Sequence, residues 1–261
     1  MPLSRRALLG GLSALPLVPR VAWAGVDIHV ISSGAFTAAY RALGPRFEQR
    51  SGHRLVSAFG ASMGQASDAI PQRLARGETA DVILLAADAF EEMVRRGFGV
   101  PGSRVDLAES RIAIAVRAGA PKPDIGSVDA LRRALLEARS IAYSASASGV
   151  YYETELVQRL GIADQVLPRS RRIYSERVAA VVARGEAELG IQQLSEHLPV
   201  AGIEVVGFLP DEVQRVTVFS AGLIRTAPQP AAARELIAFL ASAEVAEVVA
   251  ATGLDPMSRR R

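Results

Sequence analysis

The chain has 261 residues, no cysteine, and 30 lysines and arginines against 27 aspartates and glutamates. Without cysteine, disulfide bonds and thiol chemistry are excluded, so a packed core must hold the fold together. Three arginines, Arg5, Arg6 and Arg20, lie in the N-terminal segment, and beyond it the two signs of charge balance at 27 each. A neutral chain gives no basis for a nucleic-acid-binding surface.

The N-terminal segment has the composition of a secretory signal. Arg5 and Arg6 precede an apolar run over residues 7–18, and Ala22-Trp23-Ala24 supplies the small residues that a signal peptidase recognises. We therefore expect residues 1–24 to be a signal peptide cleaved near Ala24, and the mature protein to be periplasmic. The paired arginines also match a twin-arginine export signal. No later run approaches the roughly 20 apolar residues of a membrane-spanning helix, so we expect no membrane insertion.

Beyond this segment, short apolar runs alternate with amphipathic segments. The first five segments, read in turn as strand, helix, strand, helix and strand, are residues 28–31, 38–50, 55–59, 69–76 and 82–85. Later apolar runs, read as strands, are residues 112–116, 141–143, 189–191, 205–206 and 216–219. This alternation predicts an α/β fold with mainly parallel sheets and helices on both faces.

The tetrapeptide Ala-Arg-Gly-Glu occurs twice, at residues 75–78 and 183–186. In each copy we expect a helix to end at the glycine, which adopts the left-handed cap, before a buried strand begins. This arrangement of helix, glycine turn and buried strand occurs twice, which predicts two lobes of similar structure. The expected boundaries are 25–105 with 214–261 for lobe 1, and 106–213 for lobe 2. Strands crossing between the lobes, near 105–116 and 213–224, would form a hinge that lets a ligand close the cleft.

Three turns rich in serine and glycine stand where a predicted strand gives way to a helix, at residues 32–35, 60–64 and 144–149. The first backbone amides of a helix are unpaired and the helix dipole is positive there, so small residues allow an anion to approach. Taken singly, each turn is as well explained by an N-cap serine that starts its helix. Three such turns in one chain predict a shared site for a small anion.

A serine hydrolase is an alternative, because residues 60–64 match the Gly-x-Ser-x-Gly nucleophile elbow around Ser62 and His197 follows downstream. The segment before Ser62 holds little more than a strand, a helix and a strand, which is short for that fold. The histidines have no metal-ligand spacing, and the chain lacks a Gly-Lys-Ser/Thr phosphate loop. We therefore expect neither a metal nor an organic cofactor.

With these turns in place, the chain resembles the periplasmic molybdate-binding proteins, which are class II substrate-binding proteins of ABC transporters. The matching stretches are residues 29–37, 57–62, 77–82, 147–151 and 185–190. The resemblance implies a two-lobed class II periplasmic binding protein fold, with crossover strands as the hinge and a small anion in the cleft. For the members that serve transport, it also implies an ABC permease as partner.

Three residues depart from the molybdate-binding pattern. Ala35 stands where the family usually has a serine, Gln193 where it has a tyrosine, and Arg177 where it has an asparagine, whereas Ser62 keeps the serine of the second turn. A guanidinium pairs well with a carboxylate in bidentate geometry. We therefore expect a carboxylate ligand in place of molybdate. These departures resemble a branch of the scaffold that includes periplasmic aconitate isomerase.

Membership of that branch would imply an isomerase that interconverts cis- and trans-aconitate by a cofactor-free allylic proton transfer. Such chemistry needs an acid, a base and donors to the developing negative charge. The expected catalytic residues are Tyr151 and Glu176. The expected substrate-binding residues are Ser33, Gly34, Ala35, Ser62, Met63, Ser146, Ser148, Gly149, Arg177, Val178 and Gln193. The alternative is a non-catalytic binding protein of an ABC transporter that carries molybdate or an organic anion.

Overall fold

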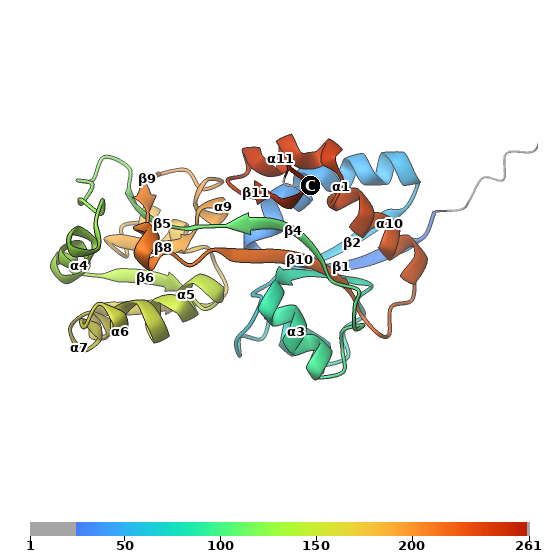
Figure 1. Cartoon of the computed structure of the whole chain (residues 1–261), viewed down its shortest axis with the longest axis horizontal. Coiled ribbons are helices and arrows are strands. Elements are labelled where there is room, and N and C mark those ends of the chain that lie inside the picture. Colours follow the sequence, from blue (N-terminus) through green and yellow to red (C-terminus); the bar gives the residue numbers. More distant parts are fainter. Residues whose placement is uncertain (1–24, 260–261) are drawn as a thin grey trace, which may run out of the picture.

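The computed structural model describes residues 25–259 and has two lobes joined by extended strands (Figure 1). The expected signal peptide, residues 1–24, lies outside the described residues. Each lobe is built on one mixed sheet with helices packed against it. Among residues 25–259, no helix has both the length and the apolar character needed to cross a membrane.

The first lobe holds a six-stranded sheet in the order β11-β4-β10-β3-β1-β2. Its strands are β1 (Asp27–Ser33), β2 (Arg54–Gly60), β3 (Val82–Ala86), β4 (Val105–Ser110), β10 (Thr217–Leu223) and β11 (Asp255–Pro256). Its helices are α1 (Gly34–Ser51), α2 (Ile70–Ala75), α3 (Ala87–Arg95), α10 (Pro230–Leu240) and α11 (Ala246–Ala251). Helix α3 covers one face of the sheet and α1, α10 and α11 lie on the other (Figure 1).

The second lobe holds a five-stranded sheet in the order β7-β6-β8-β5-β9. Its strands are β5 (Ile112–Arg117), β6 (Ile141–Ser144), β7 (Ser170–Ile173), β8 (Leu189–Gln193) and β9 (Ile203–Phe208). Its helices are α4 (Val128–Glu137), α5 (Ala147–Tyr151), α6 (Val157–Arg159), α7 (Ala163–Val166), α8 (Val178–Ala183) and α9 (Leu194–His197). A π-helical turn, Tyr152–Leu156, links α5 to α6.

Both sheets are mixed, where the sequence pattern predicts mainly parallel ones. The strand pairs β1-β2, β1-β3, β6-β7 and β6-β8 are parallel, because a helical crossover connects them. The antiparallel pairs all involve strands that lead into or out of the crossing between lobes, or the C-terminal strand: β10-β3, β10-β4, β11-β4, β5-β8 and β5-β9. Short apolar runs alone do not reveal strand direction.

The chain crosses between the lobes twice. It leaves the first sheet at the end of β4 and enters the second at β5, so that Arg111 marks the crossing, and it returns through residues 209–216 into β10. Strands β4 and β10 pair side by side along this bridge (Figure 1). Residues 106–110, assigned to lobe 2 on sequence grounds, pair within the first sheet. The crossover segment expected near 105–116 corresponds to β4 and β5, and the one expected near 213–224 corresponds to β10.

The repeated Ala-Arg-Gly-Glu tetrapeptide has the same local structure in both lobes. Gly77 and Gly185 have φ angles of 79° and 75°, in the left-handed region that favours glycine. Gly77 follows α2 and precedes the fully buried strand β3, while Gly185 follows α8 and precedes the equally buried β8. The two lobes therefore use one helix-turn-strand plan twice.

The core of the first lobe leaves no room for a side chain at Gly222 of β10. A Cβ atom there would lie 2.0 Å from Cε2 of Phe90, whose ring is fully buried on α3. Gly207 of β9 is the matched control, because a Cβ atom there would lie 3.5 Å from Ile125 Cδ1, an ordinary contact.

We predict that Gly222→Ala lowers the free energy of unfolding by about 1–3 kcal/mol, since overpacking forces a buried ring and its helix to shift. Gly207→Ala should change that free energy by no more than about 0.5 kcal/mol. Urea denaturation followed by circular dichroism measures both. Equal stability of the two variants would contradict the packing of α3 on β10.

Candidate functional site

The ends of strands from both lobes meet around a small cavity. Ser33, Gly34 and Ala35 reach it from the β1-α1 junction, and Ser146 and Ser148 reach it from the β6-α5 junction. The remaining lining residues are Ala147, Gln193, Glu196 and Phe219. Six of the residues expected to bind substrate are thus brought together, and they come from both lobes.

Two polar atoms of this cavity have no partner. Ser33 Oγ and Gln193 Oε1 are buried and form no hydrogen bond, whereas Gln193 Nε2 donates to Thr217 Oγ1 at 3.2 Å. Ser33 is also the N-cap of α1, an 18-residue helix, yet its side chain does not cap it. Buried polar groups normally find a partner, and a helix N-terminus favours an anion. The cavity therefore has the features of a ligand site.

Ser62 joins the two lobes beside this cavity. Its backbone amide donates to Ser146 Oγ at 3.2 Å, and its hydroxyl oxygen accepts from the amide of Ala86 at 3.1 Å. His197, the potential partner of a hydrolase nucleophile, makes its ring contact with the carbonyl of Ala113 at 3.2 Å. Burial lowers the pKa of His197 to about 4. Ser62 and His197 thus make their contacts with other groups, which disfavours the serine hydrolase alternative.

A wider cleft between the lobes shares Gly34, Ser146 and Glu196 with the small cavity. Its lining includes Gly34, Thr37 and Arg41 of α1, the turn after β2 with Asp68, residues 144–146 and 173–177, and Gln192 and Glu196. Arg41 comes from the first lobe and lies over the ring of Phe59, 4.5 Å from its centroid. Arg177 comes from the second lobe. The cleft is therefore bordered by one guanidinium from each lobe.

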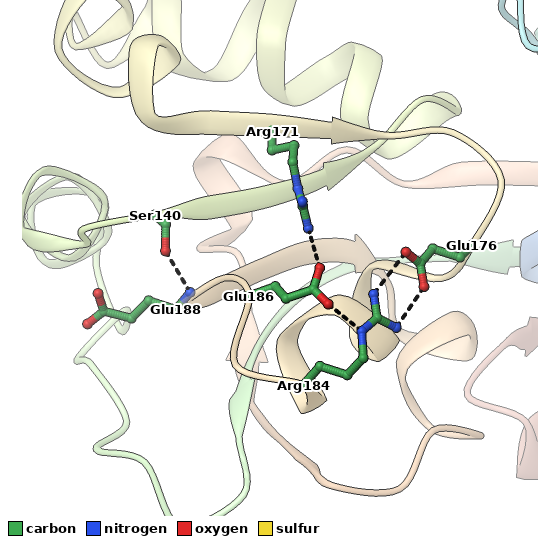
Figure 2. A network of polar contacts seen from close by, with 6 residues as sticks. All are labelled: Ser140, Arg171, Glu176, Arg184, Glu186 and Glu188. Atoms are coloured by element: carbon green, nitrogen blue, oxygen red, sulfur yellow. Dashed lines mark hydrogen bonds and ion pairs between the residues drawn. The ribbon is translucent and has the colours of Figure 1, made fainter.

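Arg177 is presented by a loop that ion pairs hold in place. Glu176 accepts two hydrogen bonds from Arg184, at 2.9 and 3.0 Å, and Arg184 also binds Glu186, which binds Arg171 in turn (Figure 2). The hydrogen bond from Arg184 lowers the pKa of Glu176. A half-exposed carboxylate engaged in this way is a poor proton acceptor, and it anchors the loop to the end of α8.

The helix that follows this loop is anchored too. Arg177 is the N-cap of α8, and the amide of the buried Val178 donates to Gln192 Oε1 at 3.0 Å. The side-chain amide of Gln192 donates in turn to Glu196 Oε1 at 3.0 Å. Val178 thus acts through its backbone, and a chain of polar contacts links the Arg177 loop to Glu196.

Tyr151 lies apart from Glu176. It is buried, its hydroxyl donates to the carbonyl of Val213 at 2.7 Å, and it lines a second cavity with Met63, Arg215 and residues of β10. Arg215 lies over the Tyr151 ring, 5.0 Å from its centroid. The two residues expected to be catalytic are therefore not brought together, and each already has a structural partner.

Gly149 is buried at the start of α5 and serves close packing. A Cβ atom at Gly149 would lie 1.6 Å from the carbonyl oxygen of Ser144, so only glycine fits against the end of β6. The hydroxyl of Ser144 lies 3.0 Å from that of Ser148. These contacts shape the turn that carries Ser146 and Ser148 to the cavity.

Glu196 and Arg41 are site residues that the sequence pattern did not reveal. Glu196 is only 8 % exposed and lines both the small cavity and the wider cleft. A Cβ atom at Gly34 would lie 2.0 Å from Glu196 Oε1, so this carboxyl lies directly against the start of α1. Burial raises the pKa of Glu196 to about 7, opposed by Arg177 and by the hydrogen bond from Gln192. In the sequence, Glu196 follows the junction between β8 and α9. This junction lacks the serine and glycine turn that marked the three candidate anion-binding junctions, so only its place after a buried strand could have pointed to Glu196.

Comparison with known proteins identifies relatives over most of the chain. Residues 28–255 match the model of a bacterial extracellular solute-binding protein family. An aconitate isomerase of a Pseudomonas species is 45 % identical over 230 residues, which cover 88 % of each chain. The molybdate-binding protein of Rhodobacter capsulatus is 28 % identical over 251 residues, covering 94 % of this chain and 95 % of the other.

Solved structures share the fold at low sequence identity. The periplasmic molybdate-binding protein of Azotobacter vinelandii superposes with a TM-score of 0.66 at 21 % identity, covering 87 % of this chain and 98 % of the other. A sulfate-binding protein of Mycobacterium tuberculosis gives a TM-score of 0.70 at 16 % identity, covering 90 % and 88 %. The class II two-lobed fold expected from the sequence is confirmed.

The raised pKa of the buried Glu196 carboxyl predicts how the free energy of unfolding depends on pH. Because its pKa in the folded protein is raised from 4.5 to about 7, its stabilising contribution is fully present below pH 4.5 and is lost as the pH rises through 7. Relative to Glu196→Gln, the wild type should therefore lose about 3 kcal/mol of unfolding free energy over that interval. The opposite contribution of His197 is common to both proteins and cancels.

Urea denaturation of both proteins at pH 5 and pH 8 measures this difference. Glu188→Gln, which alters an exposed carboxylate bonded to Arg139, should follow the wild-type pH profile. A difference between wild type and Glu196→Gln that does not vary with pH would contradict the buried position of the carboxyl.

Proposed function

The chain belongs to the bacterial extracellular solute-binding protein family, and on that premise we propose that it is an aconitate isomerase. Its lobes would close on aconitate, a small tricarboxylate, and interconvert the cis and trans isomers. The 45 % identity to the Pseudomonas aconitate isomerase over 88 % of both chains supports this reaction. The expected signal peptide and the extracellular character of the family support action in the periplasm.

The observation that carries the proposal is the pair of arginines on facing lobes of one cleft. Arg177 and Arg41 both line the wider cleft, and guanidinium groups bind carboxylates in bidentate geometry. A substrate with carboxylates at separate positions engages both arginines, whereas a small tetrahedral oxyanion spans less of the cleft. Ala35 and Gln193 also line the cavity where the molybdate-binding pattern has hydroxyl groups.

The chemistry of the isomerisation fits the groups at the site. Aconitate has a methylene carbon next to its double bond, and loss of a proton there leaves an allylic anion spread over three carbons and their carboxylates. Ser33, the unpartnered donor at the start of α1, and the first amides of that helix would stabilise the carboxylate that gains charge. Proton transfer and anion stabilisation are within the reach of protein side chains, so we propose a reaction without a cofactor.

Tyr151 and Glu176 have structural roles in this proposal. Tyr151 ties α5 to the segment before β10 through Val213, and Glu176 holds the Arg177 loop through Arg184. Substituting Glu176 would then weaken substrate binding through Arg177 and leave the proton-transfer step itself in place.

The second candidate function is non-catalytic delivery of an organic anion to an ABC permease. It is favoured by the family match and by the similarity to molybdate-binding proteins. Binding without turnover would distinguish it, since both functions need a closing cleft lined with anion donors.

We predict that purified protein converts trans-aconitate to a mixture with the cis isomer, and that a chelator leaves the rate unchanged. Liquid chromatography of the isomers over time measures the conversion. A protein that binds aconitate in calorimetric titration but never alters the isomer ratio would be the transport component. Tight binding of molybdate with no response to aconitate or citrate would exclude tricarboxylates altogether.

We also predict that Arg177→Ala raises the Kd for aconitate about 10- to 100-fold, the loss expected for one charge-assisted pair of hydrogen bonds. Arg41→Ala should have a smaller effect, because Arg41 is exposed to water. The matched control is Arg46→Ala, which lies on the same helix outside the cleft lining. Isothermal titration calorimetry compares the three, and an unchanged Kd in Arg177→Ala would remove Arg177 from the site.

A further inference from the structure

Glu196 combines a position at the substrate cavity with a side chain that no structural role fully explains. It lies on α9, directly after β8, and its carboxyl crosses the lobe junction to the first residue of α1. Contacts between α1 and α9 join the two lobes at this point. A buried carboxyl costs stability unless it is neutral or paired, and a single hydrogen bond, from Gln192, is made to Oε1.

We propose that Glu196 is the one acid-base residue of the isomerisation, removing the allylic proton of aconitate and returning it at the other end of the same allyl system. This inference rests on the proposed function and names the group that performs it. In the forward step Glu196 takes a proton from the methylene carbon, and the C–H electron pair enters the allyl system. In the return step the same carboxyl delivers the proton to the former vinyl carbon. The double bond has then moved by one position, with no net oxidation.

The charged groups around Glu196 suit both halves of this cycle. Arg177 and Arg41 line the same cleft. Two further carboxyl groups, Asp68 and Glu176, also line it, and Glu176 is neutralised by Arg184. Next along α9, His197 faces the carbonyl of Ala113 and stays neutral because burial lowers its pKa to about 4. With its own pKa raised to about 7, Glu196 exists in both protonation states near neutral pH, as a residue that alternately accepts and donates a proton requires.

Two other carboxyl groups in the cleft are less well placed. Glu176 is held in a bidentate ion pair with Arg184, half exposed at the mouth of the cleft. Asp68 lines the wide cleft but does not reach the small cavity, whereas Glu196 lines both spaces. Of these three carboxyl groups, only Glu196 therefore lines the cavity that holds the unpartnered hydroxyl of Ser33 and the unpartnered carbonyl oxygen of Gln193.

A single acid-base residue has a stereochemical consequence. The proton leaves and returns on the face of the substrate that Glu196 contacts, and it spends the interval on a carboxyl shielded from water by the closed lobes. Part of the isotope removed from the methylene carbon should therefore reappear at the new methylene carbon of the product. Two separate residues for removal and delivery would exchange the isotope with solvent instead.

The test begins with wild-type turnover of trans-aconitate, which decides the proposed function on its own. If the wild type turns over, Glu196→Gln should lower kcat at least about 100-fold. It should still bind aconitate with a Kd within a few-fold of wild type. Asp68→Asn tests the other carboxyl group that lines the cleft, and this variant should retain far more turnover than Glu196→Gln. Glu188→Gln, on the surface of the second lobe, controls for loss of an acidic side chain.

Two further measurements distinguish proton transfer from mere positioning. The wild-type kcat/KM should fall as the pH drops below about 7, and Glu196→Asp should keep such an acid limb at reduced kcat, while the residual activity of Glu196→Gln should lack it. In ordinary water, wild type acting on aconitate deuterated at its methylene carbon should form product that retains some deuterium at the new methylene. Wild-type turnover that persists in Glu196→Gln, or the absence of deuterium from the new methylene carbon in the first turnovers, would overturn the assignment to Glu196.

Discussion

The meeting of strand-helix junctions from two lobes is the constraint on which the rest of this structure depends. At each junction a helix starts with unpaired amide groups, and closing the lobes removes water from them. Ser33 Oγ and Gln193 Oε1 are left buried without partners at this point, while the Ser62 amide donates to Ser146 Oγ across the junction. A bound anion accepts a hydrogen bond from the Ser33 hydroxyl, so ligand binding and lobe closure are linked in one equilibrium.

The same exclusion of water sets the electrostatics of the cleft. A carboxyl group that would be ionised in solution is buried at Glu196 beside Arg177, and burial outweighs the arginine in determining its pKa. Glu176, one residue before Arg177, remains in solvent and is neutralised by Arg184 (Figure 2). Two glutamates near one arginine thus have opposite pKa shifts, because burial dominates at Glu196 and the hydrogen bond from Arg184 dominates at Glu176. Such a difference allows one of them to exchange protons and the other to hold a loop.

The scaffold explains how a binding fold is able to support catalysis. A solute-binding protein already surrounds its ligand with donors and excludes water, which are also requirements for stabilising a carbanion-like transition state. The additional requirement is a group that exchanges a proton near neutral pH at the ligand. In this chain a glutamate on the short helix α9 meets the N-terminal glycine of α1 and lines the cavity.

Local features of the sequence determined the α/β class, the two lobes, the glycine-capped repeat at Gly77 and Gly185, and the turns carrying Ser33 and Ser146. These features depend on near neighbours in the chain, through hydrophobic periodicity, capping and turn chemistry. Only the tertiary structure decided the strand directions, the separation of Tyr151 from Glu176, and the entry of Glu196 and Arg41 into the site. Glu196 carries no local motif; burial raises its pKa, and its carboxyl meets Gly34 of α1 in the other lobe, far away in the sequence. Burial and cross-lobe proximity are properties of the folded chain, because they depend on residues that meet only after both sheets have formed.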